Sequence, residues 1–267
     1  LKSHISKLKF PFYIIITYKI FNMTRHISKT ELLYKKSKPI DHLSVGKGIT
    51  LMVNEQKNAA MAVKNVTSSL ELAINQIYER LMLHNKGRLI YAGAGTSGRI
   101  GVQDGVELLP TFNWPNSRLD YIIAGGNKAI LKAVENAEDD VLAAKQAVSK
   151  KFINSNDVVI GLAASGNTPF TCKVLEEADK KGALTIAISN NPDGNILKFG
   201  HAKIILDTQE EVISGSTRLK AGTAQKICLN IISSMVMIKM GRIKNGTMSH
   251  MVPTNEKLRN RKLRLDK

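Results

Sequence analysis

Five short apolar segments, most of them separated by stretches long enough to form a helix, constrain the fold of this chain more than any other feature. They comprise residues 89–92, 121–124, 158–162, 184–188 and 203–206. Apolar runs this short predict buried strands, and spacers of helix length predict right-handed crossovers between parallel strands. We therefore expect an α/β fold whose five-stranded parallel sheet is flanked by helices on both faces.

Helical periodicity precedes the first predicted strand. Between residues 41 and 85, apolar side chains recur at steps of three and four, most clearly at Ala59, Ala62, Val63, Val66, Leu70, Ile74, Ile77 and Leu81. This spacing predicts a helical lead-in to the sheet. A chain of 267 residues is long enough for one such domain with appendages.

The net charge of +17 is concentrated at the two ends of the chain. Residues 1–40 carry +8 and residues 242–267 carry +6, whereas the 201 residues between them carry only +3. Basic ends on a nearly neutral body are typical of solvated tails, and no basic face with interleaved aromatic residues indicates a nucleic-acid partner. We expect a disordered extension over 1–40, the folded domain over 41–241 and a basic C-terminal segment over 242–267.

The first 22 residues and the cysteines bear on localisation. An apolar patch at 10–18 is too short to span a bilayer, and no small-residue cleavage site follows it. Met23 is therefore a candidate start of the protein. Cys172 and Cys228 have no disulfide or metal-site spacing, which predicts reduced thiols in a reducing compartment. We expect a cytoplasmic protein without a membrane partner.

Loops rich in glycine and hydroxyl side chains follow four of the predicted strands, at 93–99, 163–169, 189–192 and 214–226. The carboxyl ends of parallel strands share one edge of a sheet, where ligands bind. Serine and threonine there are also ordinary helix N-caps, but several such loops at one edge favour a shared site for an anion such as phosphate. The glycines at 93–98 have the spacing of a dinucleotide fingerprint, yet no acidic residue ends the second predicted strand to hold a ribose.

Six blocks of sequence resemble the sugar isomerase (SIS) domain superfamily and, within it, the N-acetylmuramic acid 6-phosphate etherases. In chain order these blocks are 93–99 (GAGTSGR), 104–112, 133–140 (AVENAEDD), 163–169 (AASGNTP), 215–226 (GSTRLKAGTAQK) and 254–258. The resemblance covers roughly residues 30–261. It implies an SIS-type sheet with a short C-terminal helical extension, acting as a homodimer on a phosphosugar.

The resemblance implies a lyase that cleaves the D-lactyl ether of its substrate, leaving N-acetylglucosamine 6-phosphate and D-lactate. Elimination and then hydration of this kind needs two carboxyl groups in different protonation states and neither a metal nor a cofactor. The family's catalytic glutamates fall on Glu107 and Glu138. Glu107 is implied to protonate the leaving ether oxygen, and its apolar sequence neighbours could desolvate it. Glu138 is implied to act at C2 or on the water; without the resemblance, both would be read as surface carboxylates.

The predicted substrate-binding residues lie in the hydroxyl-rich loops. Hydroxyl groups and helix N-termini can hold a phosphate with few cations. We expect the phosphate to bind hydroxyls of Ser97, Ser165, Thr168 and Ser216, with Thr96, Gly98, Gly166 and Asn167 shaping the loops. Lys220 is a further candidate for a phosphate or carboxylate of the substrate, although a surface lysine in the first turn of a helix explains it equally well.

The chain departs from the family pattern at several positions. Thr30-Glu31 is followed by Leu32-Leu33-Tyr34 where the family has an Arg-Asn pair, Leu108-Leu109 replaces Cys-Pro, Asn167 stands where arginine is common, and the C-terminal region is shorter. The alternative function is a non-catalytic regulator that binds phosphosugars, since the glucokinase regulatory protein resembles the same etherases. Such a sensor needs neither Glu107 nor Glu138. Aldose–ketose isomerisation is disfavoured by the etherase-like block at 215–226.

Overall fold

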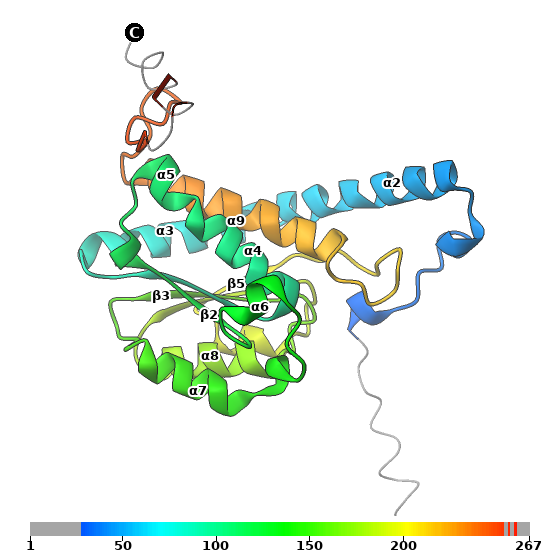
Figure 1. Cartoon of the computed structure of the whole chain (residues 1–267), viewed down its shortest axis with the longest axis horizontal. Coiled ribbons are helices and arrows are strands. Elements are labelled where there is room, and N and C mark those ends of the chain that lie inside the picture. Colours follow the sequence, from blue (N-terminus) through cyan, green and yellow to red (C-terminus); the bar gives the residue numbers. More distant parts are fainter. Residues whose placement is uncertain (1–27, 254–255, 257–258, 261–267) are drawn as a thin grey trace, which may run out of the picture.

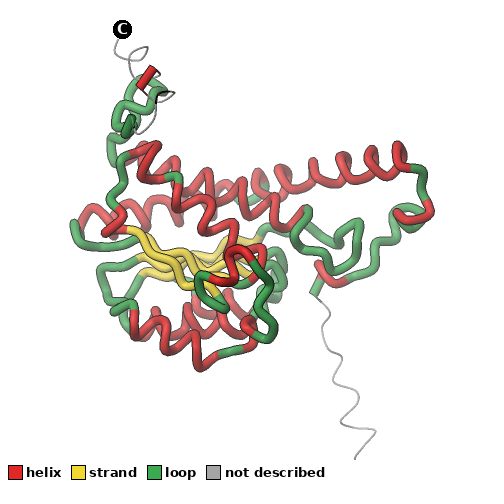
Figure 2. Tube along the Cα trace, viewed as in Figure 1, coloured by secondary structure: helices red, strands yellow, loops and turns green. Residues whose placement is uncertain are grey.

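Five parallel strands form one sheet at the centre of the chain in the computed structural model, which describes residues 28–253, 256 and 259–260 (Figures 1 and 2). The strands are β1 (Leu89–Gly93), β2 (Leu119–Ile123), β3 (Val158–Ala163), β4 (Leu184–Ser189) and β5 (Ala202–Ile205). Their order across the sheet is β2-β1-β3-β4-β5, and every neighbouring pair is parallel. The predicted sheet is confirmed, with strand ends within two residues of those expected.

Helices cover both faces of the sheet, as expected (Figure 1). On one face lie α3 (Thr67–Leu83), α4 (Gly95–Val106), α5 (Leu108–Phe112) and α9 (Lys220–Lys239), and on the other α7 (Val141–Lys150) and α8 (Pro169–Lys180). Strands β1, β3 and β4 are wholly or almost wholly buried, because both of their faces pack on helices. The order of elements thus places every β-to-α loop at one edge.

The helical lead-in consists of α2 (Val45–Lys64) and α3, joined by a short turn. Only the C-terminal part of α2 is buried, at Ala59, Ala62 and Val63, where it packs against α9. The N-terminal half extends beyond the body of the molecule (Figure 1) and exposes Val45, Ile49 and Val53. These three side chains recur every fourth residue and so form one apolar stripe on α2.

Helix α9 belongs to the core. It is the one helix among the described residues that is long and apolar enough to cross a membrane, but 56% of the relevant window is buried inside the fold. Cys228, Leu229, Ile232 and Val236 of α9 face the sheet and are at most 1% exposed. Its apolar character therefore follows from packing against β strands and α2–α3.

Residues 28–40 correct the predicted N-terminal boundary. Thr30 is 0% exposed, its Oγ1 accepts a hydrogen bond from Asn191 Nδ2 at 3.0 Å, and Lys29 Nζ lies 2.6 Å from Asp207 Oδ2. The segment thus packs on the sheet edge through polar contacts, which leave no hydrophobic periodicity in the sequence. We use "N-terminal strap" for residues 28–36. Residues 1–27, with Met23 and the apolar patch, lie outside the described residues.

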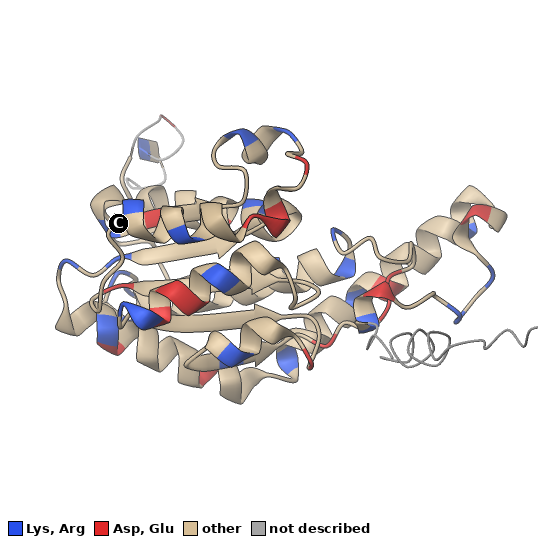
Figure 3. Cartoon of the chain, turned by 90° about the horizontal axis from the view of Figure 1, so that it is seen from below, with Lys and Arg blue, Asp and Glu red and all other residues tan. Residues whose placement is uncertain are grey.

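The basic C-terminal segment also contacts the body up to residue 253. Met251 is 4% exposed, Val252 N donates to Pro110 O at 3.3 Å, and Arg242 Nη1 donates to Asn113 O at 2.8 Å. Most of the predicted helical extension, including most of the block at 254–258, falls outside the described residues. Along the ribbon of the body, positions of basic and acidic residues are interspersed in the view of Figure 3.

Candidate functional site

The site lies where the strand order reverses. The chain passes from β1 to β2 on one side and returns to β3 on the other, so the loops after β1 and β3 leave the sheet in opposite directions. Gly93 pairs with Leu162 at the end of this strand pair, which places residues 94–97 beside residues 163–166. Crevices at such a reversal are the usual ligand sites of open parallel sheets. The sequence predicted both loops, and the strand order brings them together.

Glycines allow the first of these loops to turn tightly into α4. A Cβ on Gly93 would lie 2.8 Å from Gly98 N, and a Cβ on Gly98 would lie 2.9 Å from Gly93 O. Gly95 has φ +52°, in the left-handed region. The close approach aims the unpaired N–H groups of the first turn of α4 at the crevice, where they can bind an anion. Ser97 lies in this turn and is 8% exposed.

The loop after β3 is held by a second close approach. Gly166 has φ +73°, and a Cβ there would lie 2.4 Å from Gly194 Cα. Asn167 joins its neighbours: its amide Nδ2 donates to Ser165 O, and its Oδ1 accepts from Asn195 N at 3.0 Å. Asn167 thus ties the loop to Asn195, and Thr168 stands at the N-cap of α8.

Four of the predicted ligand side chains have no hydrogen-bond partner among the described residues. Thr96, Ser97, Thr168 and Ser216 form no side-chain hydrogen bond to another described residue. Thr96 also connects two of the loops, because a Cβ on Gly222 of α9 would lie 3.4 Å from Thr96 Cγ2 and 3.3 Å from Thr217 O. The loops after β1 and β5 therefore meet over Gly222, beside Ser216.

A cleft of about 310 Å³ adjoins the first turn of α4. Its walls include Thr96 and Arg99 from α4 and the segment 133–138, which ends in Glu138. Glu138 is exposed and lies in a 3-10 turn (η4, Ala137–Asp139), between Asn136 at φ 56° and Asp140, which caps α7 by accepting from Ala143 N. The structure therefore brings Glu138 to the proposed phosphate loop.

Glu107 lies far from this cleft, beyond the C-terminal end of α4. Ten residues of helix separate it from Ser97, and at a rise of about 1.5 Å per residue this is about 15 Å along α4. Glu107 is exposed, as is Val106 at 51%, while Leu108 turns into the core. The apolar surroundings suggested by its sequence neighbours are therefore absent within one chain, and Glu107 does not line the cleft that holds Glu138.

Lys220 is placed differently from either expectation. It is 1% exposed rather than at the surface, and its Nζ lies 2.8 Å from Glu55 Oε2 and donates to Glu210 O. The two oxygens of Glu211 accept from the N–H groups of Lys220 and Ala221, at 3.0 and 2.8 Å. A carboxylate thus already occupies the N-terminus of α9, and the Lys220 ammonium group is engaged in an ion pair with α2.

Two features of the site were missed from the sequence. The N-terminal strap crosses the loops after β3, β4 and β5, and a Cβ on Gly215 would lie 3.0 Å from Glu31 Oε2. The family resemblance at Thr30-Glu31 was the available signal. Arg99 lines the cleft and binds three backbone carbonyl groups of the opposite wall. It ends the block at 93–99 that resembles the family, but the sequence indicated no role for it.

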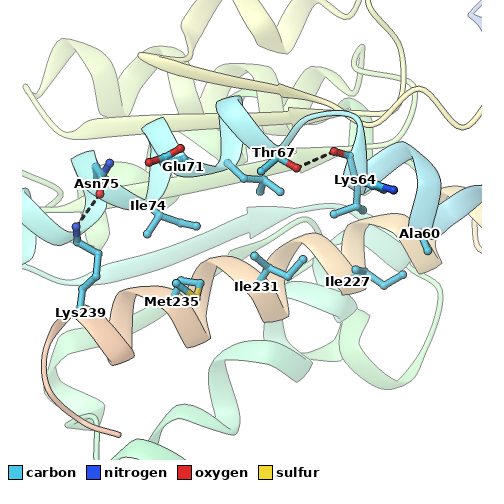
Figure 4. A pocket seen from close by; sticks show the side chains of 12 residues that line it. Ala60, Lys64, Thr67, Glu71, Ile74, Asn75, Ile227, Ile231, Met235 and Lys239 are labelled. Carbon is cyan, nitrogen blue, oxygen red and sulfur yellow. Dashed lines mark hydrogen bonds between the residues drawn. The ribbon is translucent and has the colours of Figure 1, made fainter. Parts of the chain in front are cut away.

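A larger groove of about 620 Å³ lies between α3 and α9 (Figure 4). Much of its lining is apolar, with Ile74 of α3 opposite Ile227, Ile231 and Met235 of α9. None of the predicted site residues lines it, and its one hydroxyl group, that of Thr67, donates to Lys64 O at 2.7 Å. Nor do the described residues include a group of three His, Cys, Asp or Glu side chains placed to bind a metal.

Comparison with known proteins decides the family. The chain is 43% identical over 237 residues to N-acetylmuramic acid 6-phosphate etherase of Deinococcus radiodurans, covering 89% of this chain and 77% of that protein. It is 44% identical over 219 residues to the etherase of Clostridium beijerinckii, covering 82% and 71%. The chain belongs to the N-acetylmuramic acid 6-phosphate etherase family. The predicted family and enzyme class are confirmed.

Domain models and solved structures agree with an SIS-type fold. The SIS domain model matches residues 128–235, and the model of the glucokinase regulatory protein N-terminal SIS domain matches residues 71–178. The fold is similar to phosphoheptose isomerases of Francisella tularensis (TM-score 0.57, 19% identity, 73% of this chain and all of that one) and Neisseria gonorrhoeae (0.53, 16%, 74% and all). At these identities the likeness concerns the fold alone.

Proposed function

We propose that this chain is a lyase that cleaves the D-lactyl ether of N-acetylmuramic acid 6-phosphate, yielding N-acetylglucosamine 6-phosphate and D-lactate in the recycling of cell-wall amino sugars. The observation that carries the proposal is the identity of 41–44% with etherases over most of the chain. Glu107 and Glu138 are both present in the blocks that resemble the family. The two free cysteines, Cys172 and Cys228, suit a reducing cytoplasm.

The first turn of α4 and the hydroxyls of Ser97, Ser165, Thr168 and Ser216 hold the 6-phosphate. Thr96, Gly98, Gly166 and Asn167 keep these loops in place. Holding the phosphate fixes the sugar so that its reacting carbons lie within reach of the carboxyl groups, which removes much of the entropic cost of the reaction. Lys220 supports the site through Glu55 and leaves the anion to neutral donors.

The chemistry needs an acid and a base. In the open-chain sugar the C1 aldehyde acidifies the C2 proton, which a carboxylate removes as the C3–O bond breaks. Glu107 gives its proton to the departing ether oxygen, so that D-lactate leaves rather than an alkoxide. Water then adds at C3 of the conjugated double bond, and a proton returns to C2. Glu138 serves at C2 or activates the water.

The separation of the two glutamates supports a homodimer whose sites are shared. Within one chain, Glu107 follows the C-terminal end of α4, whereas the cleft lined by Glu138 adjoins its N-terminal end. The Glu107 that completes a cleft therefore comes from the partner subunit. Apolar side chains on the two helices that flank the Glu138 segment in the chain favour a protein contact there, since Leu131 of α6 is 89% and Leu142 of α7 is 70% exposed. The partner proposed for the site itself is the phosphosugar, without a metal or cofactor.

The regulator hypothesis has one observation in its favour, the match of residues 71–178 to the regulatory protein's SIS domain. That match covers the phosphate loops, which a sensor and an enzyme share. The etherase relatives match a larger part of the chain, and a sensor needs neither glutamate. Catalysis is therefore the function that the site supports best.

The test is incubation with N-acetylmuramic acid 6-phosphate in heavy water, followed by detection of D-lactate and of deuterium at C2 of the product. We expect both. Folded protein that releases no lactate, yet binds the substrate, would establish the regulator instead. Glu107→Gln should abolish lactate release but preserve C2 exchange on added product if Glu138 is the separate base; loss of both reactions would place Glu107 at C2.

A further inference from the structure

The cleft at Glu138 has two walls, and one side chain joins them. The first wall is the first turn of α4, which carries Thr96 and Ser97, and the second is the segment 129–138. Arg99, two residues after Ser97, crosses between them. Its Nε donates to Ala129 O at 3.0 Å and to Ile130 O at 3.2 Å, and its Nη2 donates to Lys132 O at 3.4 Å.

These three carbonyl groups belong to the C-terminal end of α6 (Lys128–Leu131) and the residue after it. The last carbonyls of a helix have no partner within it and carry partial negative charge, so a guanidinium fork binds them well. In the described chain, every hydrogen bond between residues 94–99 and 129–138 comes from Arg99. The Arg99 side chain therefore links the first turn of α4 to the segment 129–138 and fixes their relative position.

Residues 133–136, between the Arg99 contacts and the turn at Ala137, have few other contacts, whereas the turn itself packs against α8 through Ala137. From Ala133 to Glu138 no backbone N–H group donates to another described backbone carbonyl, and the next fixed points are the 3-10 turn at Ala137 and the Asp140 cap. Val134 packs against Gly125, since a Cβ on Gly125 would lie 2.9 Å from Val134 Cβ. A segment held so sparsely moves easily when one of its attachments is lost.

We propose that Arg99 is a positioning residue for Glu138, which sets the distance between the bound phosphate and this carboxylate. The kinetic consequence rests on the proposed function. A misplacement of about 1 Å costs about 100-fold in rate when reacting groups must be aligned. The substrate is held by α4 and the hydroxyl loops, so its affinity should change much less than the rate.

Arg118 supplies a matched control. It too is half-buried and donates to three backbone carbonyls, those of Leu81, His84 and Gly87, but at the opposite edge of the sheet. Arg99→Gln and Arg118→Gln therefore remove equal numbers of hydrogen bonds. Arg99→Lys and Arg118→Lys retain the charge but lose the fork.

The experiment compares the four variants with the wild-type chain. It measures hydrogen–deuterium exchange, kcat and KM for lactate release, and inhibition by inorganic phosphate. For Arg99→Gln we expect faster exchange within 129–138, a fall in kcat of about 10- to 100-fold and unchanged inhibition by phosphate. Arg99→Lys should recover part of the rate. Arg118→Gln should speed exchange near 81–88 and leave kcat unchanged.

Two results would overturn the proposal. One is unchanged exchange within 129–138 in Arg99→Gln, which would show that Arg99 does not hold the segment. The other is a weakened phosphate inhibition with an unchanged kcat, which would make Arg99 a ligand of the anion. If the wild-type chain releases no lactate, the proposed function fails. Hydrogen–deuterium exchange within 129–138 still decides whether Arg99 holds the Glu138 segment.

Discussion

At the scale of single residues, the site depends on glycines as much as on functional groups. Gly166 adopts φ +73° and touches Gly194, so the loop that carries Ser165 and Thr168 can close only if both positions lack a side chain. The hydroxyl groups then converge because the backbone has room to turn. Small residues thus set the geometry within which the polar ones act.

Gly166→Ala should damage both stability and phosphate binding. Its Cβ would lie 2.4 Å from Gly194 Cα and 2.5 Å from Ser189 Oγ, in a backbone conformation that disfavours side chains. We expect the free energy of unfolding to fall by about 2–4 kcal/mol, the sum of strain and overpacking. Gly126→Ala is the control, since φ is +66° with nothing within 4 Å, and it should cost only about 1 kcal/mol. Equal losses in denaturant unfolding would contradict the packing argument.

Lys220 and Glu55 form an ion pair whose loss should be costly. Burial raises the pKa of Glu55, but the hydrogen bond and charge of Lys220 outweigh it and lower this pKa below the usual glutamate range. Glu55→Gln leaves the Lys220 ammonium group buried without a counter-charge, and we expect a loss of about 3–5 kcal/mol in unfolding free energy. The exposed Glu71→Gln should change stability by less than about 0.5 kcal/mol.

The sign of the pH dependence follows from the same shift. A carboxyl group with a lowered pKa in the folded state stabilises the fold above its unfolded pKa, and this contribution is lost as the pH falls through the folded pKa. The unfolding free energy of the wild type should therefore fall more steeply with decreasing pH once the pH is below the usual pKa range of glutamate. Glu55→Gln should lack that component, and an identical acid transition in both proteins would rule the ion pair out as its source.

At the scale of elements, α4 is fixed by a buried carboxylate. Asp104 is 5% exposed and accepts hydrogen bonds from Tyr91 OH at 2.7 Å, Asn230 Nδ2 at 2.7 Å and Ser233 Oγ at 3.1 Å. These donors come from β1 and α9, so one side chain joins three elements. It stands one helical turn before Glu107, and the orientation of the end of α4 depends on it.

Asp104→Ala should therefore destabilise the protein by about 3 kcal/mol or more, because two buried donors and the half-buried Asn230 lose a charged acceptor. The exposed Asp41→Ala provides a comparison and should lie within about 0.5 kcal/mol of the wild type. Chemical unfolding measures both. A small effect of Asp104→Ala would mean that water replaces the carboxylate, and that α4 is held mainly by apolar packing.

Elements were predictable where a pattern repeats over several residues. The strands and the helical lead-in follow from apolar runs and steps of three and four, which depend on neighbours in the sequence. The strap at 28–36 was missed because its contacts with Asn191, Asp207 and Glu55 are single polar pairs far away in the chain. Such contacts leave no local pattern.

At the scale of the whole molecule, the separation of Glu107 from the Glu138 cleft makes a complementation test possible. Glu107→Gln and Glu138→Gln should each be inactive alone. If two subunits share each site, mixed dimers contain one intact site, and random exchange of subunits should restore about a quarter of wild-type activity. Activity that stays at zero, while mass measurement shows mixed dimers, would place both glutamates of a site on one chain.

The strands, the loops that follow them and the family could be predicted from the sequence, because each depends on residues close together in the chain. Glu107 and Glu138 remain the predicted catalytic pair. The packing of distant segments brings the loops after β1 and β3 together at the reversal of strand order, buries Lys220 on Glu55 and leaves Glu107 outside the cleft that Glu138 lines. The physical reason is that strand order, burial and helix direction arise from packing between distant segments. A motif names the groups of a site, and the packing of the sheet and helices sets the distances between them.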